Sequence, residues 1–277
     1  GLRELGLRPG GLVALHSSLS SLGWVTGGAH AVVSAFLDVL GPQGTLMAPA
    51  FTHCFAPKDG RHRARQGPFD RSHTPSSVGR VSEAIRLWPG ACRSFHPIHS
   101  ASAIGPLASE LTSGHESGSD FGPQSPFARL VKRRGLIVLL GVGQFCNSTV
   151  HVVEDMLGMP YLAQETALVL GPDGEPVPFT CRNCPSGHRD FYNRQGSKWD
   201  TAIQAAGVIL HGRIGMARVQ VMDAALFARA ACEILRATPD LLLCDSPGCL
   251  FCSSAKRQLQ TLGLRQAATQ TAPAPES

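Results

Sequence analysis

The sequence predicts an α/β protein: a central, mostly parallel sheet flanked by helices, with an antiparallel portion and a small C-terminal insertion. Three observations lead to this class. Residues 11–51 read as a strand, a glycine-rich loop, a helix and a second strand, which is a βαβ unit. GLIVLLGVG at 135–143, the most strand-like run, is followed by another helical pattern. Turn residues at 172–174 indicate an antiparallel hairpin.

Each element follows from its local pattern. Residues 11–16 and 44–51 are short apolar runs typical of buried strands, and 29–40 has apolar residues at helical spacing and stops at Gly41. The patterns farther along predict a helix at 77–87, a proline-containing loop at 93–100, a helix at 126–132, a strand at 135–143 and a helix from 148 to 157. They then predict a hairpin of 166–170 with 177–180, strands within 207–221 and a helix at 223–236.

Composition indicates one ordinary globular domain. Hydrophobic residues make up 43% of the chain and charged residues 16%, as in folded proteins. We expect a single domain over residues 1–268, in which 181–200 forms a lid or insertion, and a disordered tail at 269–277. No apolar run approaches the roughly 20 residues that span a bilayer, and no secretion signal is visible. The expectation is a cytoplasmic protein without a membrane partner.

The net charge of +5 is modest and would help to attract an anionic ligand. Basic residues cluster at 58–65 in a glycine-flanked stretch that reads as a solvated loop. Because no aromatic residues interleave with them, nucleic-acid binding is not expected.

The loop after the first strand carries the first candidate site. It offers four serine hydroxyls at 17–21 and ends in Gly27-Gly28, at the start of a helix. Backbone N–H groups at a helix N-terminus attract phosphate. The loop is neither a Walker A nor a GxGxxG sequence, so a diphosphate or pantetheine ligand fits it better than ATP or a dinucleotide. An ordinary Ser/Gly turn remains the alternative.

The second candidate site is NSTVHVVED at 147–155, directly after the strand at 135–143. If Ser148 caps a helix, His151 and Glu154 lie three residues apart on one face. A carboxylate beside an imidazole orients it and suits it to act as a general base. Spacing alone does not separate this interpretation from a surface His–Glu pair.

A third polar segment, RSFHPIHS at 93–100, contains one cation and two histidines. Arg93 has the geometry to bind a phosphate through two donors. His96 and His99 are also metal-ligand types, but no acidic residue lies close in sequence. A structural loop is the alternative.

These segments together resemble the aminoglycoside 3-N-acetyltransferase family. HSSLSSLGWVTGG and GPQGTLMAPAFT are similar to its opening blocks, and Phe69-Asp70, TPSSVGRVSEAIR and PGACRSFHPIHSASAIG follow in order. FGPQSPFARL, GLIVLLGVG and NSTVHVVE complete the series. The resemblance covers about residues 10 to 160. It implies an enzyme that transfers acetyl from acetyl-coenzyme A to an aminoglycoside, releases coenzyme A and confers antibiotic resistance.

The resemblance also implies roles for individual residues. The catalytic group would be His151 with Glu154, and Ser148 would stand where the family commonly has threonine. The substrate would meet the carboxylates of Asp70, Glu154 and Asp190, the last on a looser match. The cofactor would be held by His16, Ser17, Ser18, Gly23, Val25, Gly27, Gly28, Arg93, Ser94 and Ser100.

The nine cysteines, in a chain without a visible signal, suggest free or metal-bound thiols. Cys181-x2-Cys184 and Cys249-x2-Cys252 form two CxxC pairs, a recognised zinc pattern. Their separation is longer than in a compact zinc ribbon. Free thiols are therefore the expectation, with a structural zinc site on these four cysteines as the alternative.

Several alternatives stay open at this stage. The sequence does not say which aminoglycoside or which amine is acetylated, and family members that act on the 2′ amine of kasugamycin or on non-antibiotic amines would share the His151 chemistry. A non-catalytic coenzyme A-binding module and a thiol redox protein are the alternatives of another class. The oligomeric state is equally open, a homodimer included.

Overall fold

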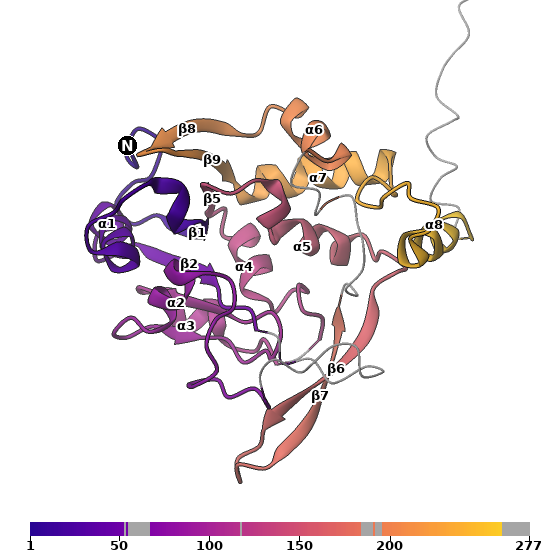
Figure 1. Ribbon diagram of the computed structural model, residues 1–277, viewed down its shortest axis with the longest axis horizontal. Helices are drawn as coiled ribbons and strands as arrows, with labels where there is room; N and C mark the ends of the chain where they lie inside the picture. The colour runs from indigo at the N-terminus through magenta and orange to yellow at the C-terminus, as the bar shows by residue number, and fades with distance from the viewer. Residues whose placement is uncertain (53, 55–66, 117, 184–190, 192–195, 262–277) are drawn as a thin grey trace, which may run out of the picture.

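A seven-stranded mixed sheet forms the centre of the molecule in the computed structural model (Figure 1), which describes residues 1–52, 54, 67–116, 118–183, 191 and 196–261. The strands lie in the order β3-β4-β2-β1-β5-β9-β8. Their bounds are β1 Leu12–Ser17, β2 Thr45–Pro49, β3 Cys92–Arg93, β4 Ala101–Ile104, β5 Leu136–Leu140, β8 Leu210–Ile214 and β9 Ala217–Asp223.

Parallel pairing occupies the centre of this sheet. Strand β1 pairs in parallel with both β2 and β5. Every other pairing in this sheet is antiparallel. Strands β8 and β9 are antiparallel because a tight turn joins them, whereas parallel neighbours need a crossover. The predicted α/β class is confirmed, and its parallel part is limited to three strands.

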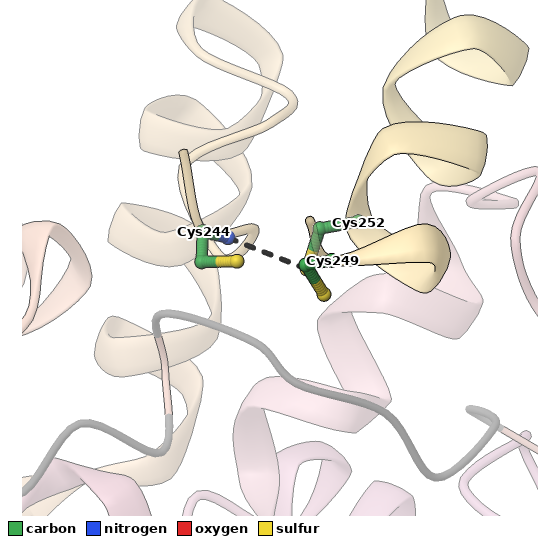
Figure 2. Close-up of side chains that lie close together, drawn as sticks. All are labelled: Cys244, Cys249 and Cys252. Carbon is green, nitrogen blue, oxygen red and sulfur yellow. Dashed lines mark hydrogen bonds between the residues drawn. The ribbon is translucent and has the colours of Figure 1, made fainter. Parts of the chain in front are cut away.

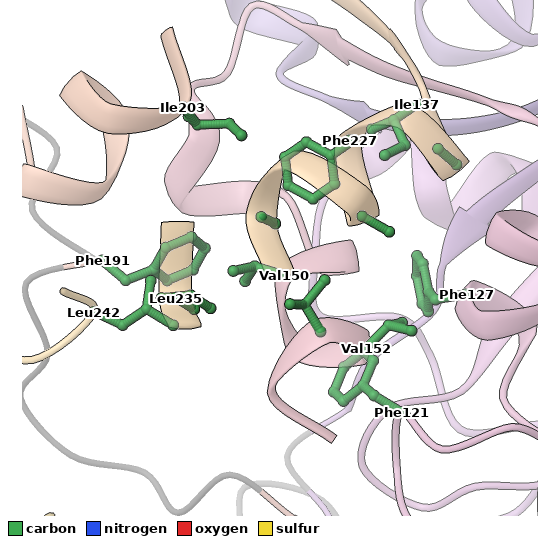
Figure 3. Packing of buried hydrophobic residues seen from close by; sticks show 14 of the residues in the cluster. Phe121, Phe127, Ile137, Val150, Val152, Phe191, Ile203, Phe227, Leu235 and Leu242 are labelled. Carbon is green, nitrogen blue, oxygen red and sulfur yellow. The ribbon is translucent and has the colours of Figure 1, made fainter. Parts of the chain in front are cut away.

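Alternation along the strands builds two hydrophobic cores. Val13 and Leu15 face α1 (Gly28–Leu40) and α2 (Arg80–Arg86). Leu12 and Ala14 point to the opposite side, as side chains of period two must. There they meet the larger core (Figure 3), which packs α4 (Pro126–Lys132), α5 (Thr149–Met156) and α7 (Ala224–Ala237) against the sheet.

The second sheet is the hairpin of β6 (Ala163–Leu170) and β7 (Pro176–Asn183), which projects from the body of the molecule in Figure 1. It confirms the hairpin expected from the turn at 172–174. Sequence patterns did not indicate β4 or three further helices. These helices are α3 (Ala108–Thr112), α6 (Lys198–Ala205) and α8 (Leu250–Thr261). The described residues also contain two short 3₁₀ helices, η1 (Leu19–Leu22) and η2 (Gln144–Cys146).

One strand that was not predicted and one helix boundary have physical explanations. Strand β4 has only four residues, of which Ala101, Ser102 and Ala103 are small, and pairing with β2 rather than intrinsic propensity makes it a strand. Helix α2 begins at Arg80 rather than residue 77, because Gly79 has φ 112° and cannot continue a helix. The predicted tail at 269–277 lies outside the described residues. No helix among the described residues is long and apolar enough to cross a membrane.

Candidate active site

A cavity opens at the carboxyl ends of the three parallel strands. It has a volume of about 250 Å³. His16 and Ser17 come from the end of β1, Pro49 ends β2, and the segment after β5 contributes Ser148 and His151. Ligands of open α/β sheets bind at this edge. The other lining residues are Phe51, Val78, Ser82, His99, Val142, Phe145, Cys146 and Phe191.

His151 is held by a buried carboxylate in the wall of this cavity. Its Nδ1 donates to Glu154 Oε2 at 2.6 Å, one turn along α5. Glu154 is fully buried, and its Oε1 accepts the hydroxyl of Tyr161 at 2.7 Å. The burial of Glu154 excludes the alternative interpretation, in which His151 and Glu154 form a surface pair. Sequence reasoning missed Tyr161, whose only local signal is its place after the turn that ends α5.

Ser148 stands at the start of α5 and also lines the cavity. Its side chain makes no capping hydrogen bond, and Asn147 Oδ1 accepts the N–H of Thr149 instead. Ser148 therefore occupies the N-cap position, as considered from the sequence, but its hydroxyl does not cap the helix. Because the helix end does not use the Ser148 hydroxyl, this geometry favours a role for the hydroxyl in the chemistry of the cavity.

The Ser/Gly loop forms a second, more open cleft of about 710 Å³. Ser17 lines both the cleft and the cavity, so the two adjoin. Ser18 N–H donates to Leu140 O at 2.9 Å and fixes the loop to the end of β5. The predicted loop residues are all present in its lining: Ser17, Ser18, Gly23, Val25, Gly27 and Gly28. Trp24, Gly79 and Arg80 also line the cleft and were not predicted.

His16 lies on the cavity side of β1 with its Nε2 buried and without a hydrogen-bond partner. Burial lowers the pKa of its imidazole to about 4, so the ring is neutral at pH 7. A buried polar atom without a partner that faces a cavity is a group that a ligand would satisfy.

Three residues predicted to bind the cofactor make contacts within the fold. Arg93 is buried, and its guanidinium donates to Ser100 Oγ at 3.1 Å and to Ala50 O at 2.9 Å, besides further backbone carbonyls. Ser94 Oγ accepts the N–H of Ala101 at 2.9 Å. None of Arg93, Ser94 and Ser100 lines either cavity. Tertiary contacts already use polar atoms of all three residues, and their role toward the cofactor stays a prediction.

The predicted substrate carboxylates are only partly placed. Asp70 lines neither cavity, and its Oδ1 accepts the N–H groups of Ser72 and His73 in a local turn. The hydrogen bond with the side chain of His73, followed by these backbone bonds, lowers the pKa of the Asp70 carboxyl. Asp190 lies outside the described residues. Glu154 is hydrogen-bonded to His151 and does not itself line a cavity. Among the described residues, no carboxylate lines either cavity.

His99 is the third histidine that lines the cavity, after His16 and His151, and a buried aspartate positions it. Its Nδ1 donates to Asp120 Oδ2 at 2.5 Å, and His96 Nε2 donates to Asp120 Oδ1 at 3.0 Å. Burial opposes ionisation of Asp120, but the two histidines outweigh it and hold its pKa well below the usual range. The ring of Phe121 contacts both His99 and His151, with centroids 5.0 Å away in each case.

Buried neutral histidines make the fold sensitive to acid. Burial lowers the pKa of His115 to about 3, as it lowers that of His16 to about 4. Both pKa values lie below the 6.5 of the unfolded chain, so the unfolded state binds more protons as the pH falls from 6.5 toward 4. We expect each histidine to cost about 2 kcal/mol of unfolding free energy at pH 5 relative to pH 7.

Urea denaturation at the two pH values measures this difference. The variant His115→Gln should lose about half of it, whereas replacing the exposed His211 by Gln should leave it unchanged. An equal pH dependence in His115→Gln and the parent would contradict the assignment.

The structure separates the cysteines that the zinc alternative grouped. Cys181 lies in β7 close to His96 and Asp120, while Cys249 and Cys252 cluster with Cys244 at the start of α8. Cys184 lies outside the described residues. Burial and the charge of Asp120 raise the pKa of the Cys181 thiol, so it is a neutral, buried thiol rather than a partner of the C-terminal pair.

The arrangement of the cleft and the cavity points to a group-transfer enzyme. A cleft at a helix N-terminus adjoins a cavity whose wall carries an oriented histidine–carboxylate pair, an arrangement that suits an enzyme transferring a group from a phosphate-bearing donor. Comparison with known proteins identifies the particular family. The sequence model of the aminoglycoside 3-N-acetyltransferase family matches residues 14–236. The chain belongs to this family and is an acyltransferase whose donor is acetyl-coenzyme A.

Relatives support this assignment. Aminoglycoside N(3)-acetyltransferase IX of Micromonospora chalcea is 33% identical over 244 residues, which is 80% of this chain and 86% of that protein. The structure of a mutant of aminoglycoside acetyltransferase AAC(3)-IVa in complex with a gentamicin superposes with a TM-score of 0.78 at 28% identity, covering 93% and 94% of the two chains. AAC-IIIb, solved as a binary complex with CoASH, gives 0.74 at 25% identity, covering 89% and 96%.

Proposed function

We propose that this protein transfers an acetyl group directly from acetyl-coenzyme A to an amino group of an aminoglycoside, with His151 as the general base. The observation that carries the proposal is the His151–Glu154–Tyr161 chain of hydrogen bonds in the wall of a cavity that adjoins the Ser/Gly cleft. Because the Nδ1–H bond to Glu154 fixes the tautomer, Nε2 carries the lone pair that accepts the proton.

The transfer needs no covalent acetyl-enzyme intermediate. The amine nitrogen attacks the thioester carbonyl carbon as His151 Nε2 takes a proton from it. The tetrahedral intermediate then collapses, the carbon–sulfur bond breaks, and the coenzyme A thiolate recovers that proton as a thiol. Ser148 Oγ, in the lining of the cavity, and the positive end of α5 are the groups we infer to stabilise the oxyanion.

The Ser/Gly cleft suits the diphosphate and pantetheine of the donor. Gly27 and Gly28 have φ of 81° and 57°, a conformation that glycine adopts without strain. They begin the long helix α1, whose first N–H groups face an anion favourably. Arg80 adds an exposed cation, and the indole of Trp24 is 95% exposed at the same cleft, where it can stack on the adenine ring.

The acceptor class rests on the relatives rather than on the cavity lining. Several curated relatives are named aminoglycoside N(3)-acetyltransferases, and one solved neighbour holds a gentamicin. We therefore infer that the acceptor is the 3-amine of an aminoglycoside. The aromatic rings of Phe51 and Phe191 and the imidazole of His99 are the described surfaces available to it.

A thiol-release assay with acetyl-coenzyme A and a panel of aminoglycosides tests the proposal. Panel members should include gentamicin, sisomicin, apramycin and kasugamycin, and NMR of the product should locate the acetyl group on the 3-amine. Acetylation at the 2′ amine of kasugamycin alone would overturn the inferred position. If the enzyme releases thiol with no member of the panel, the aminoglycoside proposal fails, although family and fold stand.

A further inference from the structure

Three cysteines from the C-terminal part of the chain converge on one point. The sulfur atoms of Cys244, Cys249 and Cys252 all lie within 4.8 Å of one another (Figure 2). Cys244 lies within the loop that joins α7 to α8, Cys249 is the residue before α8, and Cys252 is in its first turn. The three follow one another with a C-x4-C-x2-C spacing, so a single short turn brings them together. All three lie beyond residue 236, where the match to the family ends.

The backbone around these sulfur atoms is arranged for negative charge. The N–H of Cys244 donates to Cys252 Sγ at 3.4 Å, the bond drawn in Figure 2. Cys249 directly precedes the 12-residue helix α8 and so stands at its positive end. Such donors stabilise thiolates, and closely spaced thiolates need a cation to offset their repulsion.

We propose that Cys244, Cys249 and Cys252 bind a zinc ion as thiolates. Zinc takes thiolate ligands at about 2.3 Å in a tetrahedron, which sets the sulfur atoms roughly 3.8 Å apart. The observed spacing therefore needs a contraction of about 1 Å at most, within the reach of side-chain rotation. Three thiolates leave the fourth position of the tetrahedron for a water molecule or another donor.

The other cysteine cluster does not compete with this site. His96, Asp120 and Cys181 also lie close together, but both oxygens of Asp120 already accept hydrogen bonds from His96 and His99. At the C-terminal cluster, Lys198 and Lys256 lie 2.9 and 2.6 Å from the carboxylate of Asp245, the residue that follows Cys244 in the sequence. The two ammonium groups and the carboxylate together carry a net charge of +1, so the charged groups paired at Asp245 add no net negative charge to the three thiolates.

The bound ion would support the active site through two routes. Phe251, between the second and third cysteine, packs edge-on against Tyr161, which donates to Glu154. Leu242 O accepts the N–H of Phe191 at 3.3 Å, and the ring of Phe191 contacts His151. The zinc site is therefore structural: it stabilises the residues that support His151 and Glu154, and it takes no part in the acetyl transfer itself.

Metal content measured on the full-length protein tests the site independently of turnover. Purified under reducing conditions, the parent should hold about one zinc ion per chain, and Co²⁺ exchanged into it should give sulfur-to-metal charge-transfer absorption. The variants Cys244→Ser and Cys249→Ser should each bind zinc about tenfold more weakly or worse and lose the cobalt–thiolate spectrum. Circular dichroism and the midpoint of thermal unfolding show whether each variant is folded.

Two matched variants sharpen the result. Cys92→Ser replaces a partly exposed cysteine outside the cluster, and Cys181→Ser replaces the cysteine of the alternative zinc set. Both should retain the zinc and the cobalt spectrum. The proposal is overturned if the parent holds no zinc and gives no cobalt–thiolate absorption while all three thiols react with Ellman's reagent, or if Cys181→Ser abolishes binding. Either result leaves the proposed acetyl transfer untouched.

Discussion

Replacing His151 with alanine is expected to lower kcat for acetyl transfer by about 10²- to 10⁴-fold, the usual contribution of a positioned general base. The KM for acetyl-coenzyme A should stay near the parent value, since His151 lies in the cavity and not in the Ser/Gly cleft. The side chain is largely enclosed and contacts the rings of Phe121 and Phe191. Single-turnover kinetics with saturating donor measure the loss at the chemical step.

Two comparisons make the result specific. Arg80→Ala, in the cleft, should show the reverse pattern: KM for acetyl-coenzyme A about tenfold higher and more sensitive to salt, with kcat little changed. His211→Ala replaces an exposed histidine paired with Gln204 and should match the parent in both parameters. A His151→Ala enzyme that keeps more than half of the parent kcat would rule out the general-base role.

Sequence patterns predicted those parts of the site that are local in the chain. The pair His151 and Glu154 are three residues apart on one helix, so helical geometry alone brings them together. The Ser/Gly loop likewise lies between one strand and one helix, and every loop residue predicted to hold the cofactor lines the cleft. In both cases the spacing in sequence fixes the spacing in the fold.

Groups that meet through tertiary packing could not be predicted in the same way. Arg93 has the chemistry of a phosphate ligand, but backbone carbonyls of distant segments use its donors. His99 and Asp120 are separated by 21 residues and meet in the folded chain only. The cysteines show the same limit: CxxC spacing grouped Cys181 with Cys249, whereas the loop after α7 brings Cys244 to the cluster instead.

The carboxylate behind His151 should be nearly as important as the imidazole. Glu154→Gln preserves shape but is expected to lower kcat by about 10²- to 10⁴-fold, as in other enzymes in which a wrong histidine tautomer is trapped. In the parent, one carboxylate oxygen accepts from His151 Nδ1–H and the other accepts from the Tyr161 hydroxyl. A glutamine has a single oxygen. If that oxygen accepts from Tyr161, its NH₂ group faces Nδ1 and donates, which places the ring proton on Nε2 and removes the base.

Removing the tyrosine hydroxyl should therefore restore part of the activity. In Glu154→Gln/Tyr161→Phe the amide is able to turn its oxygen toward Nδ1–H, and we expect kcat to rise about tenfold above that of Glu154→Gln. Tyr161→Phe alone should reduce kcat by about tenfold, since it removes one hydrogen bond to a charged group. A double variant that is less active than Glu154→Gln would show that charge, and not the tautomer, is what Glu154 supplies to His151.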